Sequence, residues 1–286
     1  MKKIHIITDS ACDFTQEQAK EMGITILPLK TMFTDGEYLD GITLSHEEFY
    51  EKLIETREFP KTSQVNAFQY EEAYKEHQDE DILVITISKK ISGCYQSAKI
   101  ASEEFKNVHL VDSCNVSLGE QMLIKWALKL INDGKNIDEV VDELNKIKKD
   151  LCVIALIDTL EFLKKGGRLS AASAFVGTLL SFKPVIEVKN GKLEMAGKAR
   201  GSKNGQNLLR EKIHETGGID YSMPLCVAYT GLSDAILKKY LKDSEDLYID
   251  NIKTEDIPVT TIGSTIGSHV GPNAIGVAFF KKVKSN

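Results

Sequence analysis

Residues 82–98 read Ile82-Leu83-Val84-Ile85-Thr86-Ile87-Ser88-Lys89-Lys90-Ile91-Ser92-Gly93-Cys94-Tyr95-Gln96-Ser97-Ala98, and this stretch decides the predicted fold. Its first six residues are apolar or β-branched, which is typical of a strand buried on both faces. Gly93 then opens a helical run in which Tyr95, Ala98, Ala101 and Phe105 share one face. A buried strand followed by such a helix indicates a parallel sheet covered by helices.

The junction between this strand and this helix carries hydroxyl side chains. The first turn of a helix offers free backbone N–H groups and the positive end of the helix dipole, which suit a carboxylate or a phosphate. Ligands of open α/β sheets bind at the carboxyl ends of the strands. Ser92 therefore either caps the helix or contacts a ligand, and one residue can do both.

The first 150 residues alternate strands and helices, which predicts an N-terminal parallel-sheet α/β/α domain. Polar residues follow three of its predicted strands, namely Asp9-Ser10, Ser88 leading to Ser92, and Asp112-Ser113. Because the strands are parallel, we expect these three strand ends to lie at one edge of the sheet. The segment Pro60–Gln64 is interpreted as a loop.

The pattern changes near residue 151. Asn190-Gly191 separates two short apolar runs, which is the strongest short signal of a β-hairpin. Hairpins belong to antiparallel sheets, so residues 151–286 are predicted to form a C-terminal α+β domain with a mixed or antiparallel sheet. Residues 169–182 carry no charge, and we interpret them as a buried helix that is either plain core or the wall of an apolar cavity. The fold class is thus α/β with two domains, residues 1–150 and 151–286.

Composition excludes several classes of function. A net charge of −6 argues against a nucleic-acid-binding protein, which would present a basic face. No apolar run reaches 18 residues, so no membrane insertion is expected. A predicted strand directly follows Met1-Lys2-Lys3, which leaves no room for a signal peptide. The five cysteines form no CxxC pair, which predicts a reducing cytoplasmic location without disulfides or a metal site.

Two polar segments of the N-terminal half are candidate sites. Asp9-Ser10-Ala11-Cys12-Asp13 follows a strand, and Asp9 could act as a nucleophile in phosphoryl transfer. A second acid two residues later, as in two-aspartate phosphatases, is missing, and the alternative is an Asx-type cap. Thr62-Ser63-Gln64 offers two hydroxyls and an amide before a helix, or is simply a turn.

The C-terminal half adds a histidine and two arginines. His269 lies in a segment rich in glycine and serine, so it either faces a cleft or stabilises a turn. Arg168 and Arg200 adjoin glycines, where arginine can bind an anion, meet a partner or remain a solvated charge. Walker, GxGxxG, HExxH and GxSxG motifs are absent from the sequence, so no cofactor is expected.

Seven short segments occur in an order that is specific as a set. They are Thr8-Asp9-Ser10, Lys61-Thr62-Ser63-Gln64, Ile91 to Ala98, Val111-Asp112-Ser113, Phe162 to Ser170, Lys183-Pro184, and Ile266 to Pro272. Together they cover essentially the whole chain, and they resemble the DegV family of bacterial fatty-acid-binding proteins, the carrier subunits of fatty-acid kinase. The family often has threonine at the position of Cys94, and a thiol is a weaker hydrogen-bond donor.

The resemblance implies one long-chain fatty acid, such as palmitate, in an apolar tunnel between two domains. An ATP-dependent kinase subunit would phosphorylate the bound acid, so the chain would serve lipid metabolism and lipid transport without a catalytic residue of its own. The positions that match the family's carboxylate-binding residues are Thr62 and Ser92, with Ser63, Gly93 and His269 close by. Arg168 and Arg200 match positions near the carboxylate or the kinase-docking face.

Two functional hypotheses follow. The first is a non-catalytic fatty-acid carrier. The second is an enzyme of phosphoryl or acyl transfer that uses Asp9 or Ser92 as its nucleophile. The sequence favours the first, because Ser92 has no histidine and acid in a recognisable motif and Asp9 lacks its second acid.

Overall fold

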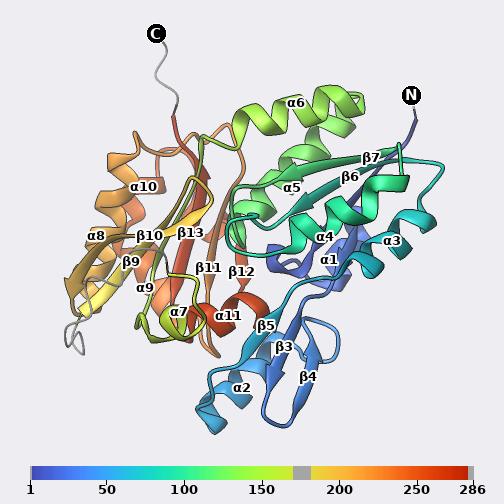
Figure 1. The fold of residues 1–286 in the computed structure, drawn as a ribbon. Coiled ribbons are helices and arrows are strands. Elements are labelled where there is room, and N and C mark those ends of the chain that lie inside the picture. Colours follow the sequence, from blue (N-terminus) through green and yellow to red (C-terminus); the bar gives the residue numbers. More distant parts are fainter. Residues whose placement is uncertain (1, 170–181, 283–286) are drawn as a thin grey trace.

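Three β-sheets organise the part of the chain that the structure, a computed structural model, describes, namely residues 2–169 and 182–282 (Figure 1). A parallel sheet comes from the N-terminal half, a mixed sheet from the C-terminal half, and a small antiparallel sheet lies beside both. The predicted α/β class with a parallel and a mixed sheet is confirmed.

The first sheet has the strand order β2-β1-β6-β7, and all its neighbours are parallel. Its strands are β1 (Ile4–Asp9), β2 (Thr25–Leu27), β6 (Asp81–Thr86) and β7 (Val108–Asp112). Nearly all of β6 is buried, as expected of a strand with helices on both faces. The covering helices are α1 (Gln16–Met22), α3 (Ala67–Glu76), α4 (Cys94–Ala101), α5 (Leu118–Asn132) and α6 (Ile137–Ile147), with short 3₁₀ turns at Ser10–Cys12 and Ser102–Glu104.

Helix starts follow the sequence signals closely. Capping boxes begin α1 at Thr15, α2 (His46–Thr56) at Ser45 and α3 at Asn66. In each box, the cap side chain accepts the backbone N–H of the third helical residue. The side chain of that third residue accepts the backbone N–H of the cap residue. These local bonds fix the start of each of the three helices.

The small sheet has the order β4-β3-β5 and includes a strand that the sequence did not predict. Its strands are β3 (Lys30–Phe33), β4 (Gly36–Leu39) and β5 (Lys61–Ser63). The interpretation of residues 60–64 as a loop was wrong, because Lys61–Ser63 pairs with β3 and places Thr62 opposite Thr31. A three-residue strand is too short to show a periodic pattern.

The second large sheet has the order β10-β9-β8-β13-β11-β12. Its strands are β8 (Leu151–Leu156), β9 (Phe182–Lys189), β10 (Lys192–Arg200), β11 (Leu225–Tyr229), β12 (Val259–Thr261) and β13 (Ile275–Phe280). Only β11 and β12 are parallel among its described pairs, and the predicted Asn190-Gly191 hairpin joins β9 to β10. A 3₁₀ turn at Thr254–Asp256 precedes β12.

The two faces of this sheet pack against different partners. One face packs on α8 (Ser202–Glu215) and α9 (Ala235–Asp243), next to α10 (Glu245–Tyr248). The other face joins the core that α5 and the first sheet share. The two large sheets fall on either side of residue 150, and the domain boundary there stays a prediction.

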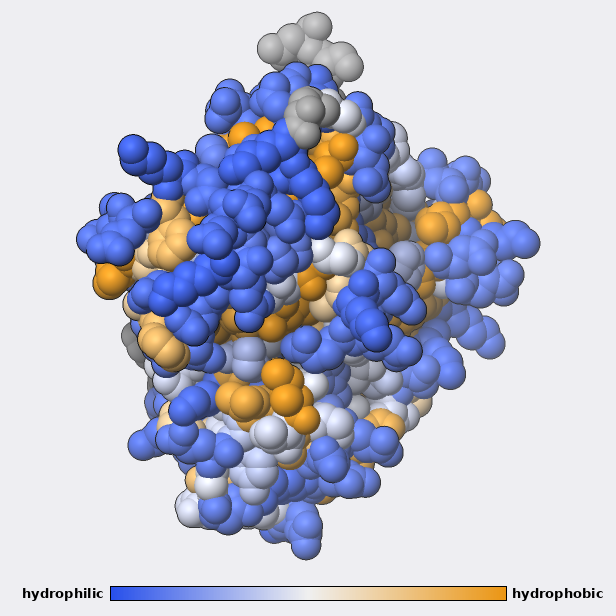
Figure 2. All heavy atoms as spheres, turned by 90° about the vertical axis from the view of Figure 1, so that its right-hand side faces the viewer, coloured by the Kyte–Doolittle hydropathy of each residue, from blue (hydrophilic) through white to orange (hydrophobic). Residues whose placement is uncertain are grey.

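Two short helices, α7 (Glu161–Lys165) and α11 (Ser264–Val270), pack against each other beside the small sheet (Figure 1). The uncharged run predicted as a buried helix lies almost wholly outside the described residues. Among the helices that the structure describes, none has the length and apolar character needed to cross a membrane. Figure 2 shows one face of the molecule, on which hydrophilic side chains predominate and apolar ones form separate patches.

Candidate functional site

A mainly apolar cavity of about 320 Å³ lies where the three sheets meet, and we call it the central cavity. Its apolar wall comes from both halves of the chain. It includes Ile87 and Ile91 after β6, Val153 on β8, Ile186 and Val188 on β9, and Ile266 on α11. A space of this size and lining is typical of a small-molecule site.

The polar side chains predicted from the sequence gather on one part of this wall. Thr62, Ser63, Ser92, Arg168 and His269 all line the central cavity, although they come from different elements. Thr62 on β5 bonds to His269 on α11, and Arg168 bonds to the carbonyl of Ile91, next to Ser92. The fold thus gathers these polar side chains in a mainly apolar space.

The Thr62 hydroxyl is oriented by the His269 imidazole. The distance from Thr62 Oγ1 to His269 Nε2 is 2.8 Å, and His269 Nδ1 has no hydrogen-bond partner among the described residues. Burial, and secondarily the positive charge of Arg168, lower the pKa of His269 to about 4, so the ring is neutral. A buried N–H without an acceptor is costly, so the ring proton belongs on Nε2, where it is donated to Thr62. The Thr62 hydroxyl proton is then free to meet a ligand.

Ser92 lines the cavity just before α4. Its Oγ lies 3.2 Å from Cys94 Sγ and donates to it, and it accepts the Cys94 backbone N–H over a longer distance of 3.4 Å. The second contact is long and therefore weak, and α4 begins after its N-cap Gly93 without a side-chain cap bond, so Ser92 is not the helix cap considered from the sequence. The hydroxyl therefore faces the cavity and the helix start at once.

Arg168 is fixed by backbone carbonyls. Its Nη1 donates to Gly166 O at 2.7 Å, and its Nε donates to Ile91 O at 3.4 Å. Guanidinium has five N–H donors, so the contacts with described residues leave others for an anion in the cavity.

Gly93 and Arg200 are placed differently from the other predicted residues. Gly93 is not part of the cavity wall, and a Cβ there would lie 1.9 Å from Gln64 Oε1. Gln64 does line the wall, so Gly93 lets the two loops approach. Arg200 ends β10, is exposed and does not line the cavity.

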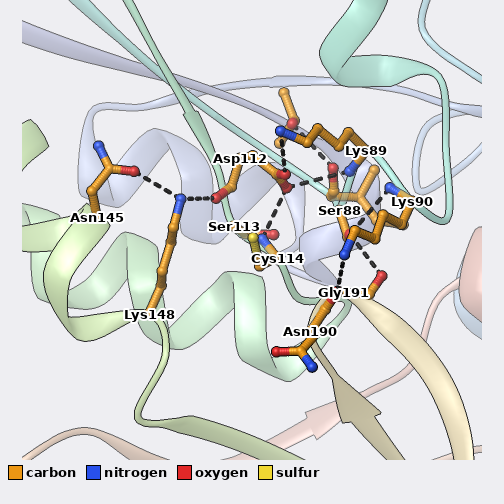
Figure 3. A network of polar contacts seen from close by, with 12 residues as sticks. Ser88, Lys89, Lys90, Asp112, Ser113, Cys114, Asn145, Lys148, Asn190 and Gly191 are labelled. Carbon is orange, nitrogen blue, oxygen red and sulfur yellow. Dashed lines mark hydrogen bonds and ion pairs between the residues drawn. The ribbon is translucent and has the colours of Figure 1, made fainter.

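The predicted meeting of strand ends is confirmed. Ile87 N–H after β6 donates to the carboxyl of Asp9, the last residue of β1, at 3.0 Å, and Ser113 N–H after β7 donates to Thr86 O. Figure 3 shows the same edge, where the Asp112 carboxylate accepts the Cys114 N–H at 2.9 Å. The loop that carries Ser92 packs against this edge of the sheet.

The same edge contacts the β9–β10 hairpin. Ser88 Oγ donates to Gly191 O, and Lys90 Nζ donates to Asn190 O, each at 2.8 Å (Figure 3). Because β9 supplies part of the cavity wall, these two bonds hold the wall against the loop that carries Ser92.

Ser117 is a cavity residue that the sequence did not reveal. It precedes α5 with φ of 56° and ψ of −124°, an unusual backbone conformation for a residue other than glycine. Its Oγ donates to Asp13 Oδ2 at 2.5 Å. No local sequence signal marks this position, since the bond spans a long stretch of chain.

Asp9 is fully buried and is not part of the cavity wall. Its carboxyl accepts Ala11 N–H at 3.2 Å and Ile87 N–H at 3.0 Å, which makes it the Asx-type cap considered as an alternative. Burial raises the pKa of Asp9 to about 7. A group without access to the cavity is poorly placed to attack a substrate.

One side-chain group in the described residues has ligand atoms close enough for a metal, namely His5, His77 and Glu80, within 4.8 Å. Contacts within the protein already occupy it. His5 Nε2 lies 2.8 Å from Thr25 Oγ1, His77 Nδ1 lies 3.2 Å from Glu80 Oε1, and Lys3 Nζ lies 2.9 Å from Glu80 Oε2. An ammonium group at the carboxylate disfavours a second cation, so the cluster is explained without a metal.

Comparison with known proteins identifies the family. The family model described as "Uncharacterised protein, DegV family" matches residues 3–282. The chain belongs to the DegV family. A DegV domain-containing protein of Clostridium perfringens is 34% identical over 298 residues, which cover 99% of each chain. The membership of the DegV family inferred from the seven segments is therefore confirmed.

Solved DegV structures agree over the full length. A DegV family protein of Thermus thermophilus, described by its fatty-acid binding, superposes with a TM-score of 0.87 at 31% identity and covers 99% of this chain and 100% of its own. DegV of Bacillus subtilis, described as a fatty-acid-binding protein, gives a TM-score of 0.83 at 27% identity, with the same coverage. Both are similar to this DegV chain in the arrangement of sheets and helices.

Proposed function

We propose that this DegV chain binds one long-chain fatty acid in the central cavity. The observation that carries the proposal is the cavity itself, a mainly apolar space whose polar lining residues include Thr62, Ser92 and His269. An apolar wall suits an acyl chain, and two hydroxyls with an arginine suit its carboxyl group. The fatty-acid binding described for its relatives supports the same ligand.

The acyl chain supplies most of the binding energy in this proposal. Burial of about 14 methylenes contributes roughly 11 kcal/mol, at about 0.8 kcal/mol each. Loss of motional freedom on association costs on the order of 4–15 kcal/mol. Hydrogen bonds to a charged group add about 1.5–3 kcal/mol apiece. The hydroxyls therefore set the orientation of the ligand and the identity of its head group.

The carboxylate contacts assigned by this proposal are Thr62 and Ser92. His269 holds the Thr62 hydroxyl so that its proton points to the ligand, and Ser63 and Arg168 share the same wall. Gly93 acts by close approach rather than by contact, because its neighbour Gln64 occupies the space beside it.

The carboxyl group held in this way is a substrate for another protein. We propose that an ATP-dependent fatty-acid kinase subunit phosphorylates it, so that the chain serves as a cytoplasmic carrier in lipid metabolism and lipid transport. Arg200 is exposed and available to such a partner. No cofactor is required for this role, because binding and presentation use only hydrogen bonds and apolar contact.

The alternative of an enzyme with its own nucleophile has less support. Asp9 does not line the cavity, and Ser92 Oγ bonds to Cys94 rather than to a histidine. A serine nucleophile needs a base within hydrogen-bond reach, and the His269 Nε2 is taken by Thr62.

Mass spectrometry of the denatured protein tests the proposal. We expect protein purified from a bacterial host to release a C14–C18 fatty acid in near-stoichiometric amount. Protein that releases no lipid and takes up no added fatty acid would overturn the proposal. The kinase step is then tested by mixing the loaded protein with a fatty-acid kinase and ATP, where acyl-phosphate should form only if both proteins are present.

A double variant tests the carboxylate assignment. T62A/S92A should weaken palmitate binding by about 100-fold or more, since two hydrogen bonds to a charged group are lost. T56A/S102A is the matched control, because both of its hydroxyls bond to helix carbonyls on the surface, away from the cavity. Equal affinity of T62A/S92A and wild type would refute the assignment.

A further inference from the structure

The short helix α11 is attached to the small sheet at two points. At its start, Ser264 Oγ lies 2.8 Å from Thr31 Oγ1 on β3. Near its end, His269 Nε2 lies 2.8 Å from Thr62 Oγ1 on β5. Thr31 and Thr62 are paired directly opposite each other, so their side chains leave the sheet on the same face. The first contact therefore lies beside the one that orients the Thr62 hydroxyl.

A buried carboxyl completes the first contact. Asp40 Oδ1 accepts both the backbone N–H and the hydroxyl of Ser264, each at 2.8 Å. Asp40 Oδ2 accepts the Ser10 hydroxyl at 2.9 Å. Because the Ser264 hydroxyl gives its proton to Asp40, the bond between Ser264 and Thr31 uses the Thr31 hydroxyl as its donor. Thr31, Ser264 and Asp40 thus form a chain of hydrogen bonds with one direction.

This chain of bonds is separate from the ligand space. Thr31 and Ser264 are fully buried, Asp40 is 2% exposed, and none of the three lines the central cavity. The first backbone N–H groups of a helix have no acceptor inside it. Here Asp40 accepts that of Ser264, and Asp13 accepts that of the preceding Gly263 at 2.8 Å. Buried carboxyls therefore fix the start of α11.

We propose that Asp40 and Thr31 are positioning residues that fix α11 on the small sheet, so that His269 holds the Thr62 hydroxyl toward a carboxyl group in the central cavity. The inference rests on the proposed fatty-acid binding and extends it to residues that do not touch the ligand. Ser264 transmits the contact from both residues to the helix.

The length of α11 explains why its start controls the position of its end. The helix covers Ser264–Val270, and about one and a half turns separate Ser264 from His269. Backbone bonds from Gly267 N to Gly263 O and from Gly271 N to Gly267 O, each 2.8 Å long, run through both turns. The helix therefore moves as one unit, and a shift at Ser264 also moves the imidazole.

Loss of the Thr31 bond should reduce selectivity for the head group. The test is the ratio of affinities for palmitic acid and 1-hexadecanol, which share a tail and differ at the head group. Hydrogen bonds to a carboxylate are stronger than those to a neutral hydroxyl, so binding of the acid depends more on the orientation of Thr62. In T31V a methyl group replaces the hydroxyl, and we expect this ratio to fall about fivefold. T31S keeps the hydroxyl and should stay within about twofold of the wild type.

S268A is the matched control on the same helix. Ser268 is buried and does not line the cavity, and its hydroxyl bonds at 2.6 Å to the Ser264 carbonyl within α11. This variant removes a buried hydrogen bond from the helix without touching the sheet contact, so its ratio should equal that of the wild type. A fall in S268A as large as in T31V would overturn the inference, because any weakening of α11 would then suffice.

A pair of variants tests Asp40. D40N keeps an acceptor oxygen for Ser264 and can donate its amide N–H to Ser10 Oγ, so its ratio should stay within about twofold of the wild type. D40A removes the acceptor of Ser264 and should lower the ratio at least as far as T31V. S264A removes the Thr31 bond from the other side with a smaller change, so it should lower the ratio even where D40A is too unstable to bind ligand.

A double-mutant cycle shows whether Thr31 acts through His269. In an H269A background, T31V should change the ratio much less than it does alone. The inference is overturned if T31V weakens acid and alcohol equally, if T31S loses selectivity as fully as T31V, or if the effect of T31V is unchanged by H269A. A wild-type protein that binds no palmitic acid would instead refute the proposed function, so the two failures are distinguishable.

Discussion

Thr62 and His269 are 207 residues apart in sequence, yet Thr62 Oγ1 and His269 Nε2 lie 2.8 Å apart in the fold. The contact joins β5 of the small sheet to α11 near the end of the chain. The imidazole is neutral and its other nitrogen has no described partner, so its single N–H is directed at Thr62. The Thr62 hydroxyl therefore accepts a hydrogen bond from His269 and can donate its own proton before any ligand is bound.

Removal of the imidazole should therefore act through Thr62. H269A should weaken palmitate binding by about five- to tenfold, the equivalent of one hydrogen bond of about 1 kcal/mol, measured by titration calorimetry. In a T62A background the same substitution should have little further effect, because the group that His269 orients is already absent. Additive effects of the two substitutions would show that His269 acts independently of Thr62.

Gly166 provides a second way to move the same imidazole. A Cβ at this position would lie 2.1 Å from His269 Nδ1, so G166A should push the ring away from Thr62. We expect palmitate affinity to fall about as far as in H269A. G36A is the matched control, since a Cβ at Gly36 would meet no atom within 4 Å. Wild-type affinity in G166A would show that the ring can shift without loss of the Thr62 contact.

Local signals account for the part of the fold that the sequence predicted. The buried run of β6 and the Asn190-Gly191 turn both depend on residues close together in the chain. The meeting of three strand ends was also predictable, because it follows from parallel strand direction alone.

Long-range contacts account for what the sequence did not predict. Thr62 is fixed by pairing of β5 with β3, and Ser117 by a hydrogen bond to Asp13. Cys94, at the position where the family often has threonine, is fully buried and does not line the cavity. None of these relationships leaves a periodic or spacing signal, since each depends on tertiary packing.

Buried acids give the protein a distinct dependence of stability on pH. Burial raises the pKa of Asp13 from 3.8 to about 8 and that of Asp9 to about 7. The folded protein then holds protons that the unfolded chain has lost, so their contribution to stability is present in full below pH 3.8 and is lost as the pH rises through about 8. Burial and Arg168 lower the pKa of His269 from 6.5 to about 4. The contribution of His269 to stability therefore has the opposite dependence: it grows as the pH rises and is complete above pH 6.5.

Between pH 6.5 and 8, Asp9 and Asp13 should determine how the free energy of unfolding changes with pH, because the contribution of His269 is already complete. The free energy of unfolding, measured with urea, should fall as the pH rises across this window. D13N should show a shallower fall, because asparagine does not titrate. D250N, at an exposed acid, serves as the control and should follow the wild type. A wild-type stability that rises across the window would contradict the assignment of protonated buried acids.

The hydrogen bonds between the Ser88 loop and the β9–β10 hairpin should control how readily the cavity wall opens. Ser88 Oγ and Lys90 Nζ donate to the carbonyls of Gly191 and Asn190, and β9 carries Ile186 and Val188 of the wall. S88A/K90A removes both bonds, so amide hydrogen exchange in residues 185–195 should speed up by about tenfold, the equivalent of roughly 1.4 kcal/mol of local opening. Amides of α8, on the other face of the sheet, serve as the internal reference and should exchange as in the wild type.

Bound palmitate should also be released faster, since the hairpin must move away from the Ser92 loop for this wall to open. Unchanged exchange in the hairpin would show that side-chain packing, and not these two bonds, holds the wall closed.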